Sequence, residues 1–171
     1  MPPAPLHAII VMGVSGVGKT TVAEVLARRL GWEFIDGDAF HPASNVEKMR
    51  SGTPLTDEDR WPWFERLAAE IDRRRSAGVR VVIACSALKR AYRAVLVGDR
   101  GDVCLVYLRG SRELIMSRLS DRKGHYFPPT LLDSQFAALE EPVPAEQALI
   151  FGVEGSIEEI ADQIVQKLDH R

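Results

Sequence analysis

Short, almost continuously apolar runs recur along the chain and alternate with longer stretches of helical periodicity. The apolar runs predict strands over residues 8–12, 33–36, 80–85, 103–108 and 148–153. Parallel strands that are covered by helices on both faces have this pattern, whereas half-exposed strands alternate apolar and polar residues. Helices are predicted between them, over residues 19–30, 57–77, 88–97, 113–121, 130–139 and 157–168. The alternation of the two patterns predicts an α/β fold.

Local signals support several of these boundaries. Gly31, Gly78 and Gly98 stand where predicted helices should end. Ser156, followed by acidic residues in the next turn, predicts the start of the last helix. The longest irregular stretches are residues 41–56 and 122–129. In an α/β fold such loops carry binding residues, so we expect function to lie there.

Size and composition limit the classes of protein that fit. A chain of 171 residues suits a single domain, residues 1–171, and its net charge of −2 gives no basic surplus for nucleic acid. No apolar run approaches the ~20 residues of a membrane span, and the amino terminus does not resemble a secretion signal. We therefore expect a cytoplasmic protein with neither a nucleic-acid nor a membrane partner. Cys85 and Cys104 lie in apolar stretches and are interpreted as buried thiols.

Residues 13–20 read Gly-Val-Ser-Gly-Val-Gly-Lys-Thr, a complete G-x-x-x-x-G-K-[ST] phosphate-binding loop. It follows the first predicted strand and opens the first predicted helix, so backbone N–H groups and the helix dipole can face phosphate oxygens. Lys19 should reach the β- and γ-phosphates as a catalytic cation, and Thr20 should ligate Mg²⁺. The predicted nucleotide-binding residues of the loop are Gly13, Ser15, Gly16, Val17, Gly18, Lys19, Thr20 and Thr21.

Two carboxylates follow the second predicted strand, in the sequence Asp36-Gly37-Asp38. The carboxyl ends of strands are where α/β sheets bind ligands. The chain lacks both the acidic pair of motor ATPases and the Asn-Lys-x-Asp guanine reader of GTPases, which favours a small-molecule kinase. We predict that Asp38 accepts or orients the proton of the acceptor hydroxyl and that Asp36 is a Mg²⁺ or water partner. An Asp-Gly turn with solvated carboxylates is the alternative.

Further motifs accompany the phosphate loop and the aspartate pair. They are His41-Pro42, Asn45-x-x-Lys48-Met49, Gly52-x-Pro54-Leu55-x-Asp57-x-Asp59-Arg60, Cys85-Ser86-Ala87-Leu88-Lys89, Tyr92-Arg93, Arg122-Lys123-Gly124-His125 and Gln135-Phe136-x-x-Leu139-Glu140-x-Pro142. Together these residues resemble the gluconokinases, small P-loop kinases related to shikimate kinase and the nucleoside monophosphate kinases. The resemblance implies transfer of the ATP γ-phosphate to the 6-hydroxyl of D-gluconate. It also implies strand order 2-3-1-4-5, an acceptor-binding segment near 38–78, a lid near 122–129 and a homodimer.

The acceptor pocket of such a kinase needs a few cations for one carboxylate and several partners for hydroxyl groups. The residues predicted to contact D-gluconate are Asp38, His41, Asn45, Lys48, Arg60, Ser86, Lys89, Arg93, His125 and Gln135. Lys89 and Arg93 are four residues apart on a predicted helix and are expected to share a face. Solvated surface residues are the alternative interpretation of Lys48 and Arg93, and Ser86 can equally cap the next helix.

Two arginines are assigned to the nucleotide through the same resemblance. Arg122, in the lid, is expected to close over the triphosphate as a catalytic cation, and Arg118 either stacks on adenine or is an exposed helix arginine. Two other functions remain open. One is a kinase for another small hydroxy acid such as shikimate, against which the Cys85-Ser86-Ala87 loop argues, and the other is an ATP-binding regulatory module without transfer activity.

Overall fold

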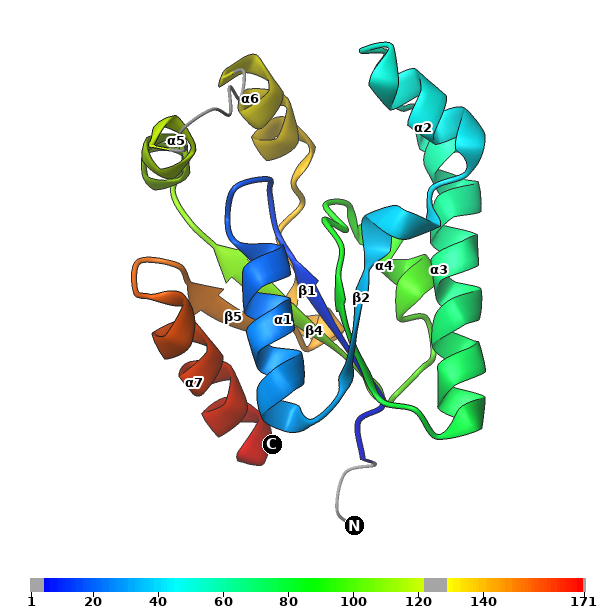
Figure 1. The fold of residues 1–171 in the computed structure, drawn as a ribbon, viewed down its shortest axis with the longest axis vertical. Helices are drawn as coiled ribbons and strands as arrows, with labels where there is room; N and C mark the ends of the chain where they lie inside the picture. The colour runs from blue at the N-terminus through cyan, green and yellow to red at the C-terminus, as the bar shows by residue number, and fades with distance from the viewer. Residues whose placement is uncertain (1–4, 122–128, 171) are drawn as a thin grey trace.

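One parallel sheet organises the computed structural model, which describes residues 5–121 and 129–170 (Figure 1). Its strands are β1 (Ala8–Met12), β2 (Glu33–Asp36), β3 (Val81–Ala84), β4 (Val103–Arg109) and β5 (Leu149–Gly152). They lie side by side in the order β2-β3-β1-β4-β5, and every neighbouring pair is parallel. The predicted fold class and strand order are confirmed.

Helices cover both faces of this sheet (Figure 1). The α-helices are α1 (Lys19–Leu30), α2 (Ala43–Arg50), α3 (Asp57–Ala77), α4 (Arg90–Leu96), α5 (Arg112–Ser120), α6 (Pro129–Ala138) and α7 (Ile157–Asp169). There are also two short 3₁₀ helices: η1 (Gly37–Phe40) follows β2, and η2 (Pro144–Glu146) precedes β5. Among the described residues, no helix combines the length and the apolar character that crossing a bilayer requires.

The central strand explains why the apolar runs do not alternate. All residues of β1 are fully buried. Ile9 and Val11 pack into one apolar cluster with residues of α1 and α7, while Ile10 and Met12 pack into a second cluster with residues of α3. A strand between two helical layers has no solvent-facing side, so each position is apolar. The predicted buried thiols, Cys85 and Cys104, lie in these layers.

Most predicted boundaries match the structure. Helices α1 and α3 end at Gly31 and Gly78, and the Ser156 hydroxyl accepts a hydrogen bond from the Glu159 N–H at the start of α7. The stretch 41–56, predicted to be irregular, contains α2. This helix has no apolar stripe, since Val46 and Met49 are exposed, and it is held to the protein by polar contacts. The hydrophobic periodicity that reveals other helices is therefore absent.

Candidate active site

Two adjoining cavities open at the carboxyl edge of the sheet, above β1, β2 and β3. The first, which we call the phosphate-loop cavity, has a volume of about 240 Å³. Its lining residues are Ser15, Lys19, Thr20, Asp36, Asp38, His41, Met49, Leu55, Arg60, Trp63, Ala84, Cys85, Ser86 and Gln135. The second, the Tyr92 cavity, has about 160 Å³ and adds Lys89, Tyr92 and residues of α6. Both share Arg60, Trp63, Ser86 and Gln135, so these four side chains face both cavities.

The phosphate loop is shaped by its backbone. A Cβ on Gly13 would lie 2.8 Å from the carbonyl oxygen of Leu108 in β4, so only glycine allows the loop to leave β1 at this point. Val14 and Val17 are buried and anchor the loop to the core. The Lys19 ammonium folds back and donates to the Val14 carbonyl at 3.1 Å. Burial lowers the pKa of Lys19, and the nearby carboxyl groups of Asp38 and Asp36 oppose that shift.

Gln135 of helix α6 is hydrogen-bonded to this loop. The Gln135 carbonyl oxygen accepts from the Ser15 N–H at 2.6 Å, and the Gln135 amide donates to the Ser15 hydroxyl at 2.7 Å. Gln135 also lines both cavities. The residue therefore joins the phosphate loop to the predicted acceptor pocket, as part of the helix that follows the predicted lid.

The aspartate turn after β2 is held by three contacts. The Asp36 carboxylate accepts from the Asp38 N–H at 3.0 Å, and the Trp63 indole N–H of α3 donates to the Gly37 carbonyl at 2.8 Å. A Cβ on Gly37 would lie 2.7 Å from the Ala84 carbonyl oxygen, so the turn packs directly on the end of β3. Partial desolvation in the cleft and the charge of Asp36 raise the pKa of Asp38, while Lys19 opposes the rise. Both carboxylates line the phosphate-loop cavity.

His41 forms the wall beside this turn. Its side chain is only 5% exposed, stacks on the Trp63 ring at 3.8 Å between centroids, and has its Nε2 3.9 Å from Asp38. Burial and the charge of Arg60 lower the pKa of His41 to about 4, so the imidazole is neutral near pH 7. A neutral ring can exchange hydrogen bonds with a hydroxyl group without adding charge to the cavity.

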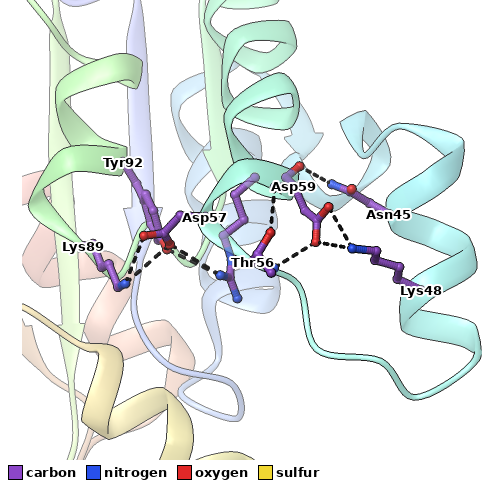
Figure 2. Close-up of polar contacts among 8 residues, drawn as sticks. Asn45, Lys48, Thr56, Asp57, Asp59, Lys89 and Tyr92 are labelled. Atoms are coloured by element: carbon purple, nitrogen blue, oxygen red, sulfur yellow. Dashed lines mark hydrogen bonds and ion pairs between the residues drawn. The ribbon is translucent and has the colours of Figure 1, made fainter.

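Two cations that line the Tyr92 cavity flank the carboxylate of Asp57, and Figure 2 shows part of this group. The Lys89 ammonium lies 3.4 Å and the Arg60 guanidinium 3.7 Å from Asp57, which also accepts a hydrogen bond from the Tyr92 hydroxyl. Both cations lie over the Tyr92 ring, at 5.7 and 5.8 Å from its centroid. Each side chain remains about one third exposed, so both can bind an anion from solution.

A second carboxylate in Figure 2 belongs to the scaffold behind the cavities. Asp59 accepts two hydrogen bonds from Lys48, at 2.8 and 3.0 Å, and one from the Thr56 N–H. The buried Asn45 amide donates to the Asp59 carbonyl at 2.8 Å. The hydrogen bonds from Lys48 and Thr56 lower the pKa of Asp59 to about 2. Lys48 and Asn45 line neither cavity, so the structure uses them to fasten α2 to α3 instead of bringing them to the acceptor pocket.

Arg93 also departs from its predicted place. Helix α4 begins at Arg90, and Lys89 precedes it with extended backbone, so the prediction that Lys89 and Arg93 share a helix face is wrong. The Arg93 side chain is 1% exposed, and its guanidinium binds Glu146 and two backbone carbonyl groups. Ser86 lines both cavities, and the residue that caps α4 is Lys89, so the alternative role of Ser86 as a helix cap is wrong.

The remaining predicted residues are Arg118, Thr20, Thr21, Arg122 and His125. Arg118 lies on α5, where its guanidinium donates to the Glu154 carbonyl at 3.5 Å in the loop between β5 and α7. Thr20 lines the phosphate-loop cavity, whereas the exposed Thr21 lines neither cavity. Arg122 and His125, with most of the predicted lid, lie outside the described residues.

The donors near Lys19 fit a magnesium ion. Mg²⁺ prefers oxygen ligands and in kinase sites is held by one or two protein groups together with phosphates and water. Thr20 and Asp36 supply a hydroxyl and a carboxylate in the same cavity, with Asp38 beside them. Within residues 5–121 and 129–170, no group of three or more His, Cys, Asp or Glu side chains gathers as a metal centre. These oxygen ligands therefore suit a metal that arrives with the nucleotide.

Sequence reasoning did not assign roles to Asp57, Tyr92 and Trp63 in the site. Asp57 and Tyr92 stand within motifs that carried the family resemblance, but they are 35 residues apart and meet only through the packing of α3 on α4. Trp63 is buried in the core, and its indole N–H also donates to the Gly37 carbonyl. Hydrophobic periodicity and motif spacing do not show which residues distant in sequence contact each other, as Asp57 and Tyr92 do.

Comparison with known proteins gives consistent relatives. A family model described as AAA domain matches residues 9–142. A probable gluconokinase of Xenopus tropicalis is 43% identical, over 95% of this chain and 94% of the relative. A gluconokinase of Gluconobacter oxydans is 46% identical, over 94% of this chain and 88% of the relative. The crystal structure of a gluconokinase from Sinorhizobium meliloti 1021 has a TM-score of 0.88 at 38% identity, covering 98% of this chain and 94% of that one.

Proposed function

This chain belongs to the gluconokinase family of P-loop kinases, and from that premise we propose how it transfers the γ-phosphate of ATP to the 6-hydroxyl of D-gluconate. The products are 6-phospho-D-gluconate and ADP. The observation that carries the proposal is that two cavities with shared walls adjoin, one lined by Lys19 and Asp38 and the other by two cations, Arg60 and Lys89, that flank Asp57. A linear acceptor with a carboxylate at one end and a hydroxyl at the other matches this arrangement.

The carboxylate of gluconate binds at Arg60 and Lys89, which are both held near Asp57 but remain accessible. Arg60 also lines the phosphate-loop cavity, so the six-carbon chain can run from the Tyr92 cavity toward the phosphate loop. Ser86, His41 and Gln135 line the path and offer hydrogen-bonding groups to the intervening hydroxyls. The acceptor segment, residues 38–78, supplies much of this wall.

Asp38 acts on the 6-hydroxyl. Its carboxylate orients the hydroxyl group and accepts its proton as the oxygen attacks the γ-phosphorus, while the bond to the β,γ-bridging oxygen breaks and ADP leaves. Lys19 moves from the Val14 carbonyl to the transferred phosphate and stabilises the negative charge there. The raised pKa of Asp38 makes it a better proton acceptor than an ordinary surface aspartate, since basicity rises with pKa.

Thr20 and Asp36 are the proposed magnesium ligands, and Mg²⁺ supplies charge neutralisation at the phosphates when it is bound. Arg118 is proposed to stack on adenine beside the Glu154 carbonyl. Arg122, as a catalytic cation, and His125 are proposed to close over the substrates as part of a lid spanning about residues 122–129. Residues 1–171 are proposed to form one kinase domain.

Location and assembly are also proposals. A kinase that consumes ATP and a metabolic sugar acid is expected in the cytoplasm, where ATP is available. A homodimer is supported by exposed apolar side chains, including Ile150 on the edge strand β5, which is 45% exposed. Light scattering during gel filtration measures the oligomeric state directly. A mass equal to one chain at micromolar concentration would contradict the homodimer.

The test is coupled ADP release from Mg-ATP with purified protein, comparing D-gluconate, shikimate, glucose, nucleoside monophosphates and no acceptor. We expect a rate that depends on gluconate, with 6-phosphogluconate as the product. Turnover with shikimate alone would favour the other hydroxy-acid kinase, although the names of the relatives do not support that alternative. Binding of ATP without transfer to any acceptor would leave a regulatory module as the function.

A further inference from the structure

Ala87 has a strained backbone in the loop that joins the two cavities. Its φ is +44°, in the left-handed region, and Gln147, with φ +54°, is the other non-glycine residue with positive φ in the described part of the chain. Such a conformation persists only where surrounding contacts enforce it, and it often accompanies function. Ala87 is fully buried and lies between Ser86, which lines both cavities, and Leu88, which precedes Lys89.

Arg93 contacts both strained segments at once. Its Nη1 donates to the carbonyl oxygens of Ala87 at 2.9 Å and Leu88 at 3.1 Å. Its Nε and Nη2 donate to the two oxygens of the Glu146 carboxylate, at 2.6 and 3.1 Å. Glu146 immediately precedes Gln147 and is itself held by the Val143 N–H at 2.9 Å. One buried guanidinium therefore ties the loop after β3 to the segment that enters β5.

The loop fixed in this way contacts both parts of the site. The Ser86 carbonyl accepts from the N–H of Gly13 at 3.3 Å, which connects it to the start of the phosphate loop. Lys89, two residues after Ala87, lies beside Asp57 in the Tyr92 cavity. Ser86 precedes Ala87 and Lys89 follows it by two residues, so a rotation of the Ala87 peptide would change the position of the Ser86 hydroxyl relative to the Lys89 side chain.

We propose that Arg93 and Glu146 form a positioning clamp that holds the left-handed Ala87 turn and so sets Ser86 and Lys89 for the acceptor. Arg93 acts through the loop and does not touch the substrate. The proposal rests on the proposed function for the identity of the acceptor. A buried, bidentate arginine suits this role because its planar group can bind a carboxylate and two carbonyl groups in fixed directions.

The chain contains a matched control. Arg100 also binds a carboxylate through two nitrogens, Nε and Nη2 to Asp72 at 2.7 and 2.8 Å, and its Nη1 also donates to two carbonyl groups, those of Val95 and Leu96. These carbonyl groups belong to α4, and Arg100 lines neither active-site cavity. Removing either guanidinium disrupts the same kinds of bond, but only Arg93 is attached to the loop after β3.

The experiment compares Arg93→Met with Arg100→Met in unfolding temperature, ATP affinity and gluconate kinetics. We expect both variants to lose thermal stability and to keep ATP affinity within about twofold. Only Arg93→Met should lower kcat/KM for gluconate, by roughly 10- to 100-fold, the range expected for small misplacement of reacting groups. Equal kinetic losses in the two variants would overturn the proposal.

Adding Ala87→Gly to Arg93→Met tests the turn itself. Glycine adopts positive φ without strain, so it should recover part of the lost kcat/KM if Arg93 works by holding this turn. A direct contact between Arg93 and the acceptor predicts no recovery, and that result would also overturn the proposal.

A third measurement does not depend on the acceptor. Amide hydrogen exchange over residues 85–90 should be faster in Arg93→Met than in the wild-type protein and unchanged in Arg100→Met. If the wild-type protein fails to phosphorylate gluconate, the proposed function is wrong, yet this exchange difference still decides whether the clamp exists. Equal exchange over residues 85–90 in all three proteins would refute it.

Discussion

The phosphate loop and the acceptor segment lie against the same cavity but are held by different forces. The loop is set by backbone geometry, with Gly13 in close contact with β4 and with Val14 and Val17 buried. The acceptor segment is set by side-chain pairs around carboxylates, chiefly Asp57 and Asp59. The nucleotide half of the site is therefore set mainly by glycine geometry and close backbone packing, whereas the acceptor half depends on ion pairs and hydrogen bonds between side chains.

This difference separates two kinds of functional residue. In the loop, backbone N–H groups are expected to face phosphate groups, which all nucleotides share, so a change there should affect nucleotide binding in general. In the acceptor segment, Asp57 organises cations that face the cavity, and Asp59 fastens α2 behind it. Substitutions in the acceptor segment should therefore affect acceptor binding and stability separately, whereas substitutions in the phosphate loop should affect several properties at once.

The largest expected effect is at Asp38, which stands where the two halves meet. Replacing Asp38 with Asn keeps the shape of the side chain but removes the proton acceptor, so kcat should fall by roughly 10²- to 10⁴-fold. ATP affinity, measured by titration calorimetry, should change little because the loop is untouched. Full turnover in Asp38→Asn would show that Asp38 is not the proton acceptor. The proposed separation of catalysis from nucleotide binding would then lose its main support.

The pH dependence of the wild-type enzyme sharpens this assignment. Partial desolvation and Asp36 raise the pKa of Asp38 above its ordinary 3.8. The base must be ionised, so activity should be lost as pH falls through that raised pKa. The acid limb of kcat/KM should therefore have its midpoint above pH 3.8, whereas a midpoint at or below this value would argue for a different base.

The second effect concerns acceptor binding. Lys89→Met or Arg60→Met should raise the KM for gluconate by about 10- to 100-fold, since hydrogen bonds to charged groups are worth about 1.5–3 kcal/mol. Lys48→Met is the control, because it removes a lysine of the acceptor segment that is paired with Asp59 and lines neither cavity. Its KM should stay within about twofold of wild type. A comparable rise of the KM for gluconate in Lys48→Met would contradict the assignment of Asp57 to the acceptor site and of Asp59 to the scaffold.

The third effect tests whether backbone geometry also limits the acceptor half. Gly37→Ala places a Cβ 2.7 Å from the Ala84 carbonyl, which must displace the turn that carries both aspartates. Overpacking of this kind costs about 1–3 kcal/mol in stability, and kcat should fall with it. Gly101→Ala is the control, since its added Cβ meets no atom within 4 Å. Urea unfolding and steady-state kinetics at one temperature measure both quantities, and a silent Gly37→Ala would contradict the packing argument.

The sequence predicts features that depend on neighbouring residues better than contacts between residues far apart in the chain. All five strands and the phosphate loop were predictable because apolar runs and glycine spacing act over a few residues, and the aspartate turn lies next to its strand. The strand order came with the family resemblance. Helix α2 was missed because polar contacts from Lys48 and Asn45 hold it. The place of Arg93 was missed because Glu146, its partner, is 53 residues away.

The smallest expected effect is a pH-dependent loss of stability from His41. Burial and Arg60 lower the pKa of His41 to about 4, against 6.5 for an ordinary histidine, so the unfolded chain binds a proton that the folded chain resists. This stabilising contribution is complete above pH 6.5 and declines as pH falls toward 4, because protonation there favours the unfolded state. His41→Phe keeps a ring against Trp63 but cannot titrate. Urea unfolding between pH 7.5 and 4.5 should show a steeper loss of stability in the wild-type protein than in His41→Phe. Parallel curves would mean that the His41 imidazole binds a proton as readily in the folded protein as in the unfolded chain. The ring stacked on Trp63 would then become positively charged at mildly acidic pH, which contradicts its lowered pKa.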